Sequence, residues 1–324
     1  MTQPEAAPTL QVSEVGEEAA EVVTALIHAG FSHRPALDPP ATALDETTAT
    51  VAAALRGAGG LLATRDGEPV GALLLDHDGD WLTLRRVSVA PQAQRLGVAS
   101  ALAAAAEEVA ERRRVPRLRL AARVELPATV ALWVRLGYRE IDRHGPLLTL
   151  AKETPVRGVA EDADATRELG RRLAGGLRAG DLLILTGDLG AGKTTLTQGL
   201  GAGLGVRGPV TSPTFVLSRV HPSEVGGPPL VHVDAYRLGL GAGAGALELD
   251  DLDLDLSLDT AVTVVEWGEG LAERLADDRL HLSIRRATGG ATDGAGDEAT
   301  EQRTVTLTAV GARWVGSDIH RLVT

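Results

Sequence analysis

Short apolar runs and amphipathic stretches alternate along the chain, a pattern typical of strands and helices in a mixed α/β protein. Helical patterns lie at 99–114, 162–181 and 195–205. Strand-like runs lie at 81–89, 146–150, 182–186, 229–234, 261–266, 281–285 and 304–310.

The pattern has a seam near 152–160. One apolar pattern closes with the strand-like run 146–150, and the next opens with a helix for which Asp162 or Asp164 is the candidate N-cap. With 324 residues, the chain is long enough for two domains that each bury a core. We therefore expect one domain at 1–152 and another at 153–324.

Composition narrows the functional classes. Hydrophobic residues make up 44% of the chain and charged residues 23%, which are values of globular proteins. The absence of cysteine excludes disulfides, thiolate metal sites and a cysteine nucleophile. A net charge of −12 argues against broad electrostatic contact with nucleic acid. Neither a signal-peptide pattern nor an apolar run of roughly 20 residues is present, so we expect a cytoplasmic protein without membrane contact.

Lysine is rare in this chain: of 32 basic residues, only Lys152 and Lys193 are lysines. Lys193 lies in GDLGAGKT at 187–194, which fits the pattern G-x-x-x-x-G-K-[ST] between a strand-like run and a helix. Glycines in such a turn let backbone N–H groups point at phosphate oxygens, and the helix N-terminus adds partial positive charge. Lys193 would serve the β- and γ-phosphates, and Thr194 would offer its hydroxyl to Mg²⁺.

Two carboxylates end apolar runs where the chemistry of a phosphate-binding loop needs them. Asp234 ends the run in PLVHVDAYRL, and Glu266 ends the run in AVTVVEWGEG. Carboxylates just past buried parallel strands lie at the sheet edge that also carries the phosphate-binding loop. The segment 211–215 (TSPTF) fits either a γ-phosphate-sensing switch or a turn before a strand. His232 is interpreted as a sheet residue and not as a metal ligand.

Four motifs of the second half, GDLGAGKTT, SPTF, HVDAYRL and VVEWGEG, resemble the bacterial TsaE (YjeE) family over about 157–322. The resemblance implies an α/β P-loop NTPase fold with a mostly parallel sheet. It implies an ATPase that works with TsaB-like and TsaD-like partners on threonylcarbamoyladenosine in tRNA, which it reaches through that complex. Hydrolysis would reset the complex between turnovers.

The same resemblance assigns residues to ATP and Mg²⁺. Lys193, Asp234 and Glu266 would be catalytic, with Thr194 and Glu266 as the ligands of Mg²⁺. Trp267 would lie near the nucleotide, and Thr166 or its neighbours near the base. The loop and helix start would bind the nucleotide through Asp188, Leu189, Gly190, Ala191, Gly192, Lys193, Thr194 and Thr195. The glycine-rich stretch 239–245 and the stretch 287–302, interpreted as a long mobile hairpin loop, depart from the family by insertion.

The first half resembles the GNAT acetyltransferases over 9–151. A Q-x-x-G-x-A turn at 94–99 follows a strand-like run and precedes a helix, and LWVRLGYREIDR at 132–143 resembles the second signature of that family. The resemblance implies a GNAT α+β fold that binds acetyl-CoA. Backbone groups of Val87 and Val89 would contact the pantetheine, and the pyrophosphate would be held by Gln94, Arg95, Leu96, Gly97, Val98 and Ala99.

Catalysis of acetyl transfer has less support in the sequence than binding of acetyl-CoA has. The tyrosine usual in the family is replaced by Trp133, and the usual asparagine by Leu126. The strand-like run 81–89 carries Arg85 and Arg86 but no glutamate that could act as a base. Transfer could proceed through water or a substrate group, or the domain could be structural, with Tyr138 packed in its core.

The leading hypothesis is a fusion of a GNAT domain with a TsaE-like ATPase. One alternative is an N-acetyltransferase regulated by a nucleotide-sensing P-loop domain. Another is a small kinase, although no lid segment is visible in the sequence. The basic run 112–120 is interpreted as a helix end, with a coenzyme A phosphate or tRNA contact as a further reading.

Overall fold

The computed structural model describes residues 9–35, 37–40, 42–213, 217–236, 258–286 and 301–323. The chain forms two compact units, Met1–Thr154 and Pro155–Thr324. The boundary expected from the sequence, between 152 and 153, lies inside the last strand of the first unit. Among the described residues, no helix is both long and apolar enough to cross a membrane.

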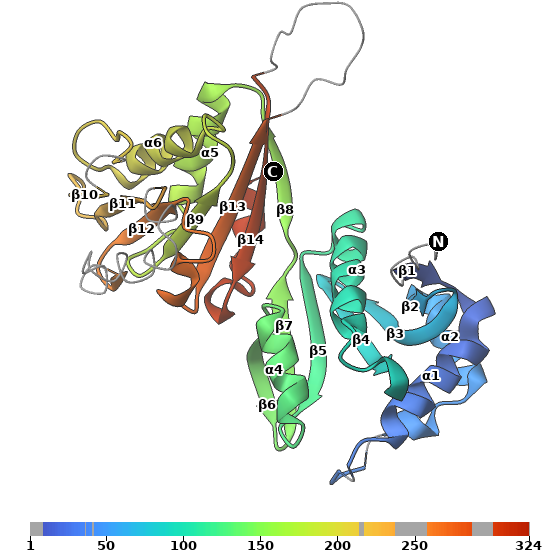
Figure 1. Ribbon diagram of the computed structural model, residues 1–324. Coiled ribbons are helices and arrows are strands. Elements are labelled where there is room, and N and C mark those ends of the chain that lie inside the picture. The colour runs from blue at the N-terminus through green and yellow to red at the C-terminus, as the bar shows by residue number, and fades with distance from the viewer. Residues whose placement is uncertain are drawn as a thin grey trace, which may run out of the picture. The chain divides into compact units, whose positions relative to one another are not determined.

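The first unit is built on a seven-stranded sheet of order β1-β2-β3-β4-β5-β7-β6 (Figure 1). All neighbouring pairs are antiparallel except β4 and β5, which are parallel. Its strands are β1 (Leu10–Val15), β2 (Gly60–Arg65), β3 (Glu68–Asp78), β4 (Trp81–Val89), β5 (Arg117–Arg123), β6 (Arg139–His144) and β7 (Leu147–Glu153).

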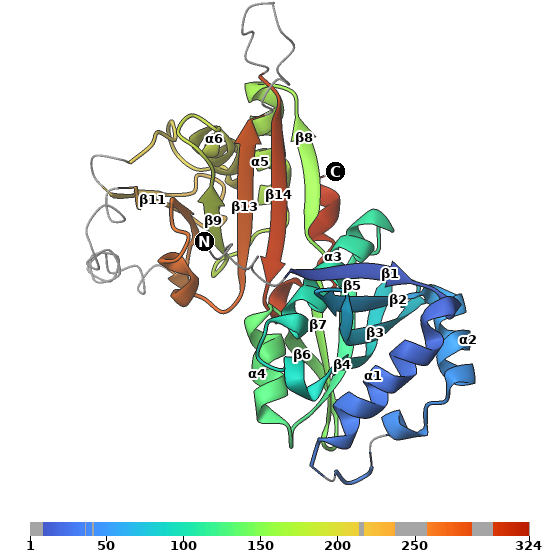
Figure 2. The ribbon, with the colours of Figure 1, turned by 45° about the vertical axis from the view of Figure 1, so that its right-hand side comes forward.

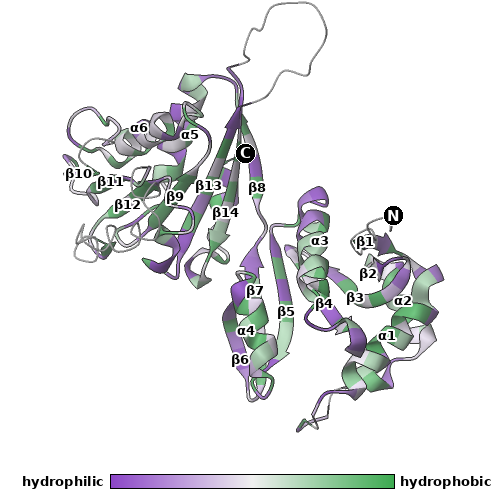
Figure 3. Cartoon of the chain, in the orientation of Figure 1, coloured by the Kyte–Doolittle hydropathy of each residue, from purple (hydrophilic) through white to green (hydrophobic). Residues whose placement is uncertain are grey.

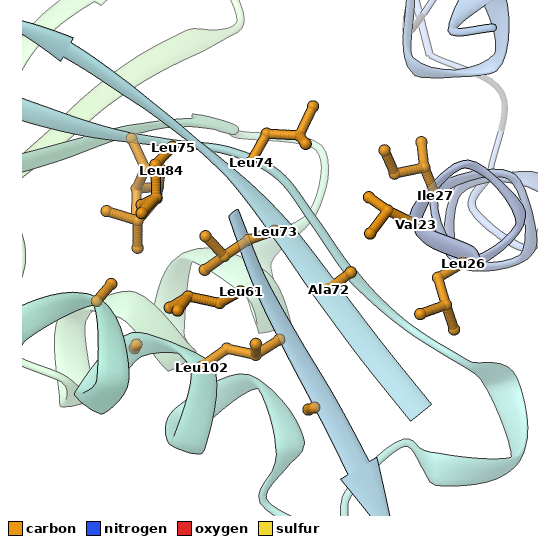
Figure 4. Packing of buried hydrophobic residues seen from close by; sticks show 14 of the residues in the cluster. Val23, Leu26, Ile27, Leu61, Ala72, Leu73, Leu74, Leu75, Leu84 and Leu102 are labelled. Atoms are coloured by element: carbon orange, nitrogen blue, oxygen red, sulfur yellow. The ribbon is translucent and has the colours of Figure 1, made fainter. Parts of the chain in front are cut away.

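Helices cover both faces of this sheet. Ala72 and Leu74 of β3 face Val23 and Ile27 of one helix, while Leu73 faces the helix on the other side, as Figure 4 shows. This alternation explains the apolar run of β3, because a strand covered on both faces buries every side chain. The helices are α1 (Ala20–Ser32), α2 (Thr48–Ala58), α3 (Val98–Arg112) and α4 (Pro127–Arg135).

The parallel strands β4 and β5 separate along their length. They pair only from Trp81–Leu84 to Arg117–Leu120, although both strands run further. Past this point β4 has an irregular register with β3, and Arg86 adopts a left-handed conformation with φ of 53°. A bulge of this kind bends the strand and turns backbone groups out of the ladder. The sheet therefore opens between β4 and β5.

The second unit has a seven-stranded sheet of order β10-β11-β12-β9-β13-β14-β8, and Figure 2 shows β13, β14 and β8 side by side. The central strands β9, β11 and β12 are largely hydrophobic and buried (Figure 3). The strands are β8 (Val156–Ala160), β9 (Leu182–Thr186), β10 (Ser218–His221), β11 (Leu230–Asp234), β12 (Val262–Glu266), β13 (Arg279–Arg286) and β14 (Arg303–Val310).

The second sheet is mixed, which corrects the expectation of a mostly parallel sheet. The central run β11-β12-β9-β13 is parallel. The edge pairings β10–β11, β13–β14 and β14–β8 are antiparallel. Parallel order is therefore confined to four strands: β9, β11 and β12, which carry the phosphate-binding loop and the two carboxylates, and β13 beside them.

Two helices of the second unit, α5 (Ala163–Ala174) and α6 (Lys193–Leu204), pack closely because of glycine. A Cβ atom on Gly170 would overlap the carbonyl oxygen of Leu196, and one on Gly199 would overlap that of Arg167. Glycines on both helices therefore allow backbone-to-backbone contact between α5 and α6. This contact fixes the start of α6, where the phosphate-binding loop ends.

The N-cap of α5 is Asp162, whose carboxylate accepts a hydrogen bond of 2.7 Å from the backbone N–H of Ala165. We expect Asp162→Ala to lower the free energy of unfolding of the second unit by about 1 kcal/mol, because this N–H loses its partner. Asp164→Ala, on the exposed first turn of the same helix, is the matched control and should change stability by less than half as much. Urea unfolding followed by circular dichroism measures both.

Candidate functional site

The phosphate-binding loop connects buried strand β9 to helix α6. Gly187, Gly190 and Gly192 have φ values of 142°, 74° and 111°, which side chains rarely allow. A Cβ atom on Gly187 would also overlap the carbonyl oxygen of Ile284. The first N–H groups of a helix have no partner within the helix, and at α6 no side chain caps them. This arrangement of donors suits the oxygens of a phosphate.

The side chain of Lys193 folds back onto the phosphate-binding loop. Its Nζ donates to the carbonyl oxygens of Gly187 at 2.7 Å and Asp188 at 3.0 Å, and lies 3.7 Å from the centre of the Trp267 ring. The side chain is only 5% exposed. Burial lowers the pKa of Lys193, while Glu266, Asp234 and Asp188 act in the opposite direction. The ammonium is therefore a buried charge held by weak acceptors, and an anion in the loop would be a stronger partner.

Glu266 joins the loop helix to the sheet. Its two carboxylate oxygens lie 3.0 and 3.1 Å from the Thr194 hydroxyl, which donates to this carboxylate. On its other side, His232 Nε2 donates to Glu266 Oε1 at 2.8 Å. Both Glu266 and His232 are buried. Thr194 and Glu266 thus form a hydroxyl–carboxylate pair at the carboxyl ends of the central strands.

Asp234 stands beside Glu266, since the two residues are partners in the parallel register of β11 and β12. The Asp234 carboxylate accepts hydrogen bonds from the Ser212 hydroxyl and from the backbone N–H of Tyr236, both at 3.0 Å. Ser212 thereby connects the segment 211–215 to the site. Thr214 and Phe215 lie outside the described residues, as do the stretch 239–245 and most of 287–302, including the expected mobile loop.

Trp267 sits in a constrained position directly after Glu266. Its φ is 62°, a left-handed conformation rare for a bulky residue, and its N–H donates to the Leu185 carbonyl at 3.0 Å. The ring packs at 5.1 Å from that of Tyr236. The constrained backbone thus places the indole against Lys193. Of the other residues predicted near the nucleotide, Thr166 lies beside Gly192, and Leu189 is exposed on the loop.

The residues present fit a nucleotide phosphate with Mg²⁺. Mg²⁺ is usually held by one or two carboxylates together with phosphate oxygens and water. Thr194 and Glu266 provide such a donor set next to the loop. Within the described residues, no cluster of three or more histidine, aspartate or glutamate side chains could hold a metal by itself. A metal here would therefore depend on the phosphates for its remaining ligands.

Two arginines near the loop did not emerge from the sequence. Arg286 and Arg303 are cross-strand partners in the last rung of the β13–β14 hairpin. A Cβ atom on Gly190 would lie 3.2 Å from Arg286 Nη2, and one on Gly192 would lie 3.4 Å from Arg303 Nε. Arg303 Nε is buried without a partner among the described atoms. Like charges directly opposite each other are destabilising, and a neighbouring anion would relieve this.

We expect Arg303→Gln and Arg286→Gln each to weaken ATP binding about three- to tenfold, because each removes a positive charge beside the loop. The affinity of both variants should also depend less on salt. Arg285 is the neighbour of Arg286 in β13 and points to the opposite face of the sheet, so Arg285→Gln is the matched control. Calorimetric titration with ATP at two salt concentrations measures all three. Equal affinities for the Arg285, Arg286 and Arg303 variants would contradict the expectation.

The first unit contains a cavity of about 1000 Å³ where β4 and β5 separate. The start of α3 borders it: Gly97 is the N-cap with φ of 81°, and no side chain caps the helix. Of the residues predicted for acetyl-CoA, Leu96 does not line the cavity and is exposed. Those that line it are Val87, Val89, Gln94, Arg95, Gly97, Val98 and Ala99.

Two aromatic residues pack against each other in the first unit: Trp133 lines the cavity, and Tyr138 lies in the core. Trp133 is buried and lines the cavity, with its ring 5.2 Å from that of Tyr138. Tyr138 is fully buried, its hydroxyl has no partner among the described atoms, and burial raises its pKa well above the usual value. Leu126 also lines the cavity. Neither aromatic residue offers an acid for a leaving thiolate.

These features define the class of the second unit, a P-loop nucleotide-binding domain, and give the first unit an open sheet with a cavity at a helix start. The family model "Acetyltransferase (GNAT) family" matches residues 29–138, and the model "Threonylcarbamoyl adenosine biosynthesis protein TsaE" matches residues 160–292. The chain belongs to the TsaE family through its second unit, which confirms the resemblance seen in the motifs.

Individual relatives match each half of the chain. The tRNA threonylcarbamoyladenosine biosynthesis protein TsaE of Streptomyces coelicolor is 63% identical over 156 residues, 48% of this chain and 98% of that protein. A crystal structure of Bacillus subtilis YdiB is 31% identical, covers 52% of this chain and 95% of that one, and has a TM-score of 0.38. A crystal structure of the PaiA N-acetyltransferase of Thermoplasma acidophilum with coenzyme A is 12% identical. The match covers 45% of this chain and 99% of that one, with a TM-score of 0.41.

Proposed function

We propose that the second half, 153–324, binds and hydrolyses ATP with Mg²⁺ in the biosynthesis of threonylcarbamoyladenosine in tRNA. The observation that carries the proposal is the convergence of Lys193, Thr194 and Glu266 at the end of β9 and β12. The name and the 63% identity of the Streptomyces coelicolor relative support this pathway.

The roles of the residues follow from their positions. Backbone N–H groups from Asp188 to Thr195 would hold the phosphates, and Lys193 would add a mobile positive charge at the β- and γ-phosphates. Thr194 and Glu266 would hold Mg²⁺, which supplies neutralising charge on the phosphate oxygens when bound. Asp234, oriented by Ser212, is placed to position a water molecule.

We further propose that this unit works with TsaB-like and TsaD-like proteins and reaches tRNA through them. The net charge of −12 supports indirect contact, because a protein that grips tRNA alone needs a basic surface. The test measures ATP hydrolysis by the full chain with and without those two proteins. A faster rate together with co-purification supports the partnership. An unchanged rate without co-purification contradicts it.

For the first half, 1–152, we propose binding of acetyl-CoA in the cavity between β4 and β5. The pyrophosphate would lie at the uncapped start of α3, from Gln94 to Ala99, and the pantetheine along Val87 and Val89. Calorimetric titration with acetyl-CoA tests this directly. Absence of binding would leave the domain a structural role.

The alternative is an acetyltransferase whose second unit senses nucleotide as a regulator. The cavity of the first unit favours it, because it gives that unit a substrate site of its own. The two hypotheses differ in two measurements. Under the alternative, ATP changes the rate of acetyl transfer and tRNA modification does not depend on Lys193.

A further inference from the structure

The cavity of the first unit is lined from both faces of the sheet. The residues at the start of α3 and along α4 line it from one face. The end of α1 and the described residues that follow it line it from the other face: Gly30, Phe31, His33, Arg34, Pro35, Leu37, Pro40 and Thr42. Helices α1 and α3 cover opposite faces of the sheet (Figure 4). Under the proposed function, acetyl-CoA occupies the α3 side. The α1 side is therefore left for the acyl acceptor, and the following inference rests on that assignment.

The charged residues that line the acceptor side are all basic. Arg34, Arg86 and Arg123 line the cavity together with His33, and no described lining residue is an aspartate or glutamate. The carboxylates of two nearby glutamates are already bound to arginine. Arg86 Nε donates to Glu46 Oε1 at 2.9 Å. Arg123 donates to both oxygens of Glu125, at 2.7 and 3.1 Å.

Arg34 is the arginine left over from these pairs. Its Nη2 donates to the Val87 carbonyl at 3.2 Å, and its guanidinium lies 3.7 Å from the centre of the Phe31 ring. No carboxylate within the described residues pairs with it. Burial lowers its pKa, which fits a cation without a compensating acid. A guanidinium has five N–H donors, so most of those on Arg34 remain for a ligand.

We propose that the acyl acceptor is a small amine that carries a carboxylate or phosphate, and that Arg34 binds this anionic group. A positively charged amine, such as a polyamine or a lysine side chain, finds no carboxylate among the described residues that line the cavity. Arg34 is thus a substrate-binding residue that sets specificity, and Phe31 and Val87 hold its guanidinium in place.

No described residue that lines the cavity is a glutamate or aspartate, so water takes the proton from the bound ammonium and the neutral amine becomes available. The amine nitrogen then attacks the thioester carbonyl carbon and loses its extra proton to water, the carbon–sulfur bond breaks, and an amide forms. The leaving thiolate takes up a proton from water, so acetyl-CoA and amine yield N-acetylamine and coenzyme A.

The test measures thiol release from acetyl-CoA by the full chain with four acceptors: glutamate, phosphoethanolamine, glycinamide and spermidine. We expect glutamate or phosphoethanolamine to exceed the other two at least about tenfold in kcat/KM, and the better of these two identifies the anion. A preference for spermidine or glycinamide would overturn the proposal. So would turnover of none of the four while acetyl-CoA binds in calorimetry.

Variants test Arg34 itself. Arg34→Gln should raise KM for the anionic acceptor about tenfold while the affinity for acetyl-CoA changes much less, and Arg34→Lys should restore part of the loss. Arg56→Gln is the control, because Arg56 is an exposed residue of α2 that pairs with Glu17 and does not line the cavity. An unchanged KM in Arg34→Gln would overturn the proposal. Failure of the unaltered chain to bind acetyl-CoA would instead overturn the proposed function.

Discussion

Replacing Lys193 by alanine is expected to weaken ATP binding at least about 100-fold, because the substitution removes the buried charge that faces the phosphates. Lys193→Arg should fail nearly as badly. The ammonium lies between the carbonyls of Gly187 and Asp188 and the face of Trp267, a space that suits a compact group and not a planar fork. Calorimetric titration of the full chain with ATP and Mg²⁺ measures both variants.

A matched control for Lys193 lies in the same unit. Arg207 is exposed, and its nearest acid, Glu224, is 3.8 Å away. Arg207→Ala should therefore bind ATP as the unaltered chain does. If Lys193→Ala kept its affinity within about threefold of this control, the phosphate-binding role of Lys193 would be wrong.

Replacing Glu266 by glutamine is expected to slow ATP hydrolysis by about 100-fold or more, while ATP binding remains within a few-fold. Glutamine keeps the size of the side chain and can still accept from Thr194 or His232, so the fold should persist. It loses the charge that the proposal assigns to Mg²⁺. Hydrolysis rates measured over a range of Mg²⁺ concentrations separate this effect from a loss of nucleotide binding.

Thr194 provides an independent check on the same site. Thr194→Ser keeps the hydroxyl and should retain most of the activity, whereas Thr194→Ala should require more Mg²⁺ for half-maximal rate. Equal Mg²⁺ requirements in Glu266→Gln, Thr194→Ala and the unaltered chain would show that the hydroxyl–carboxylate pair does not hold the metal.

The central site could be predicted from the sequence because its parts are local or follow one rule of parallel sheets. The loop, Lys193 and Thr194 are contiguous, so their geometry is set by the strand, the glycines and the start of α6. Asp234 and Glu266 are far apart in the chain, yet both end apolar runs. Parallel pairing of β11 and β12 brings them into register.

Contacts that depend on antiparallel register or on packing across the sheet could not be predicted from the sequence. Arg286 and Arg303 meet only because β13 and β14 pair in one particular register. Arg34 reaches the cavity of the first unit through its bond to the Val87 carbonyl, far along the chain. The role of His232 beside Glu266 requires knowing which face of β11 it occupies.

The two lysines illustrate the same difference between what the sequence could predict and what only the tertiary fold defines. Lys193 stood out because it lies in a motif. Lys152, next to the expected domain boundary, had no motif to explain it. In the structure it is buried in β7, and its Nζ donates to Glu107 Oε1 at 2.9 Å and to the Leu136 carbonyl at 3.1 Å. Lys152 therefore belongs to the core of the first unit, through an ion pair that only the tertiary fold defines.

The most direct test of the account measures threonylcarbamoyladenosine in tRNA from cells in which the native protein is replaced by the Lys193→Ala variant. We expect the modified nucleoside to fall to the level found when the protein is depleted, while the Arg207→Ala variant restores it. A normal level of the modified nucleoside with Lys193→Ala as the only source of the protein would contradict the central claim that nucleotide binding in the P-loop unit serves this modification.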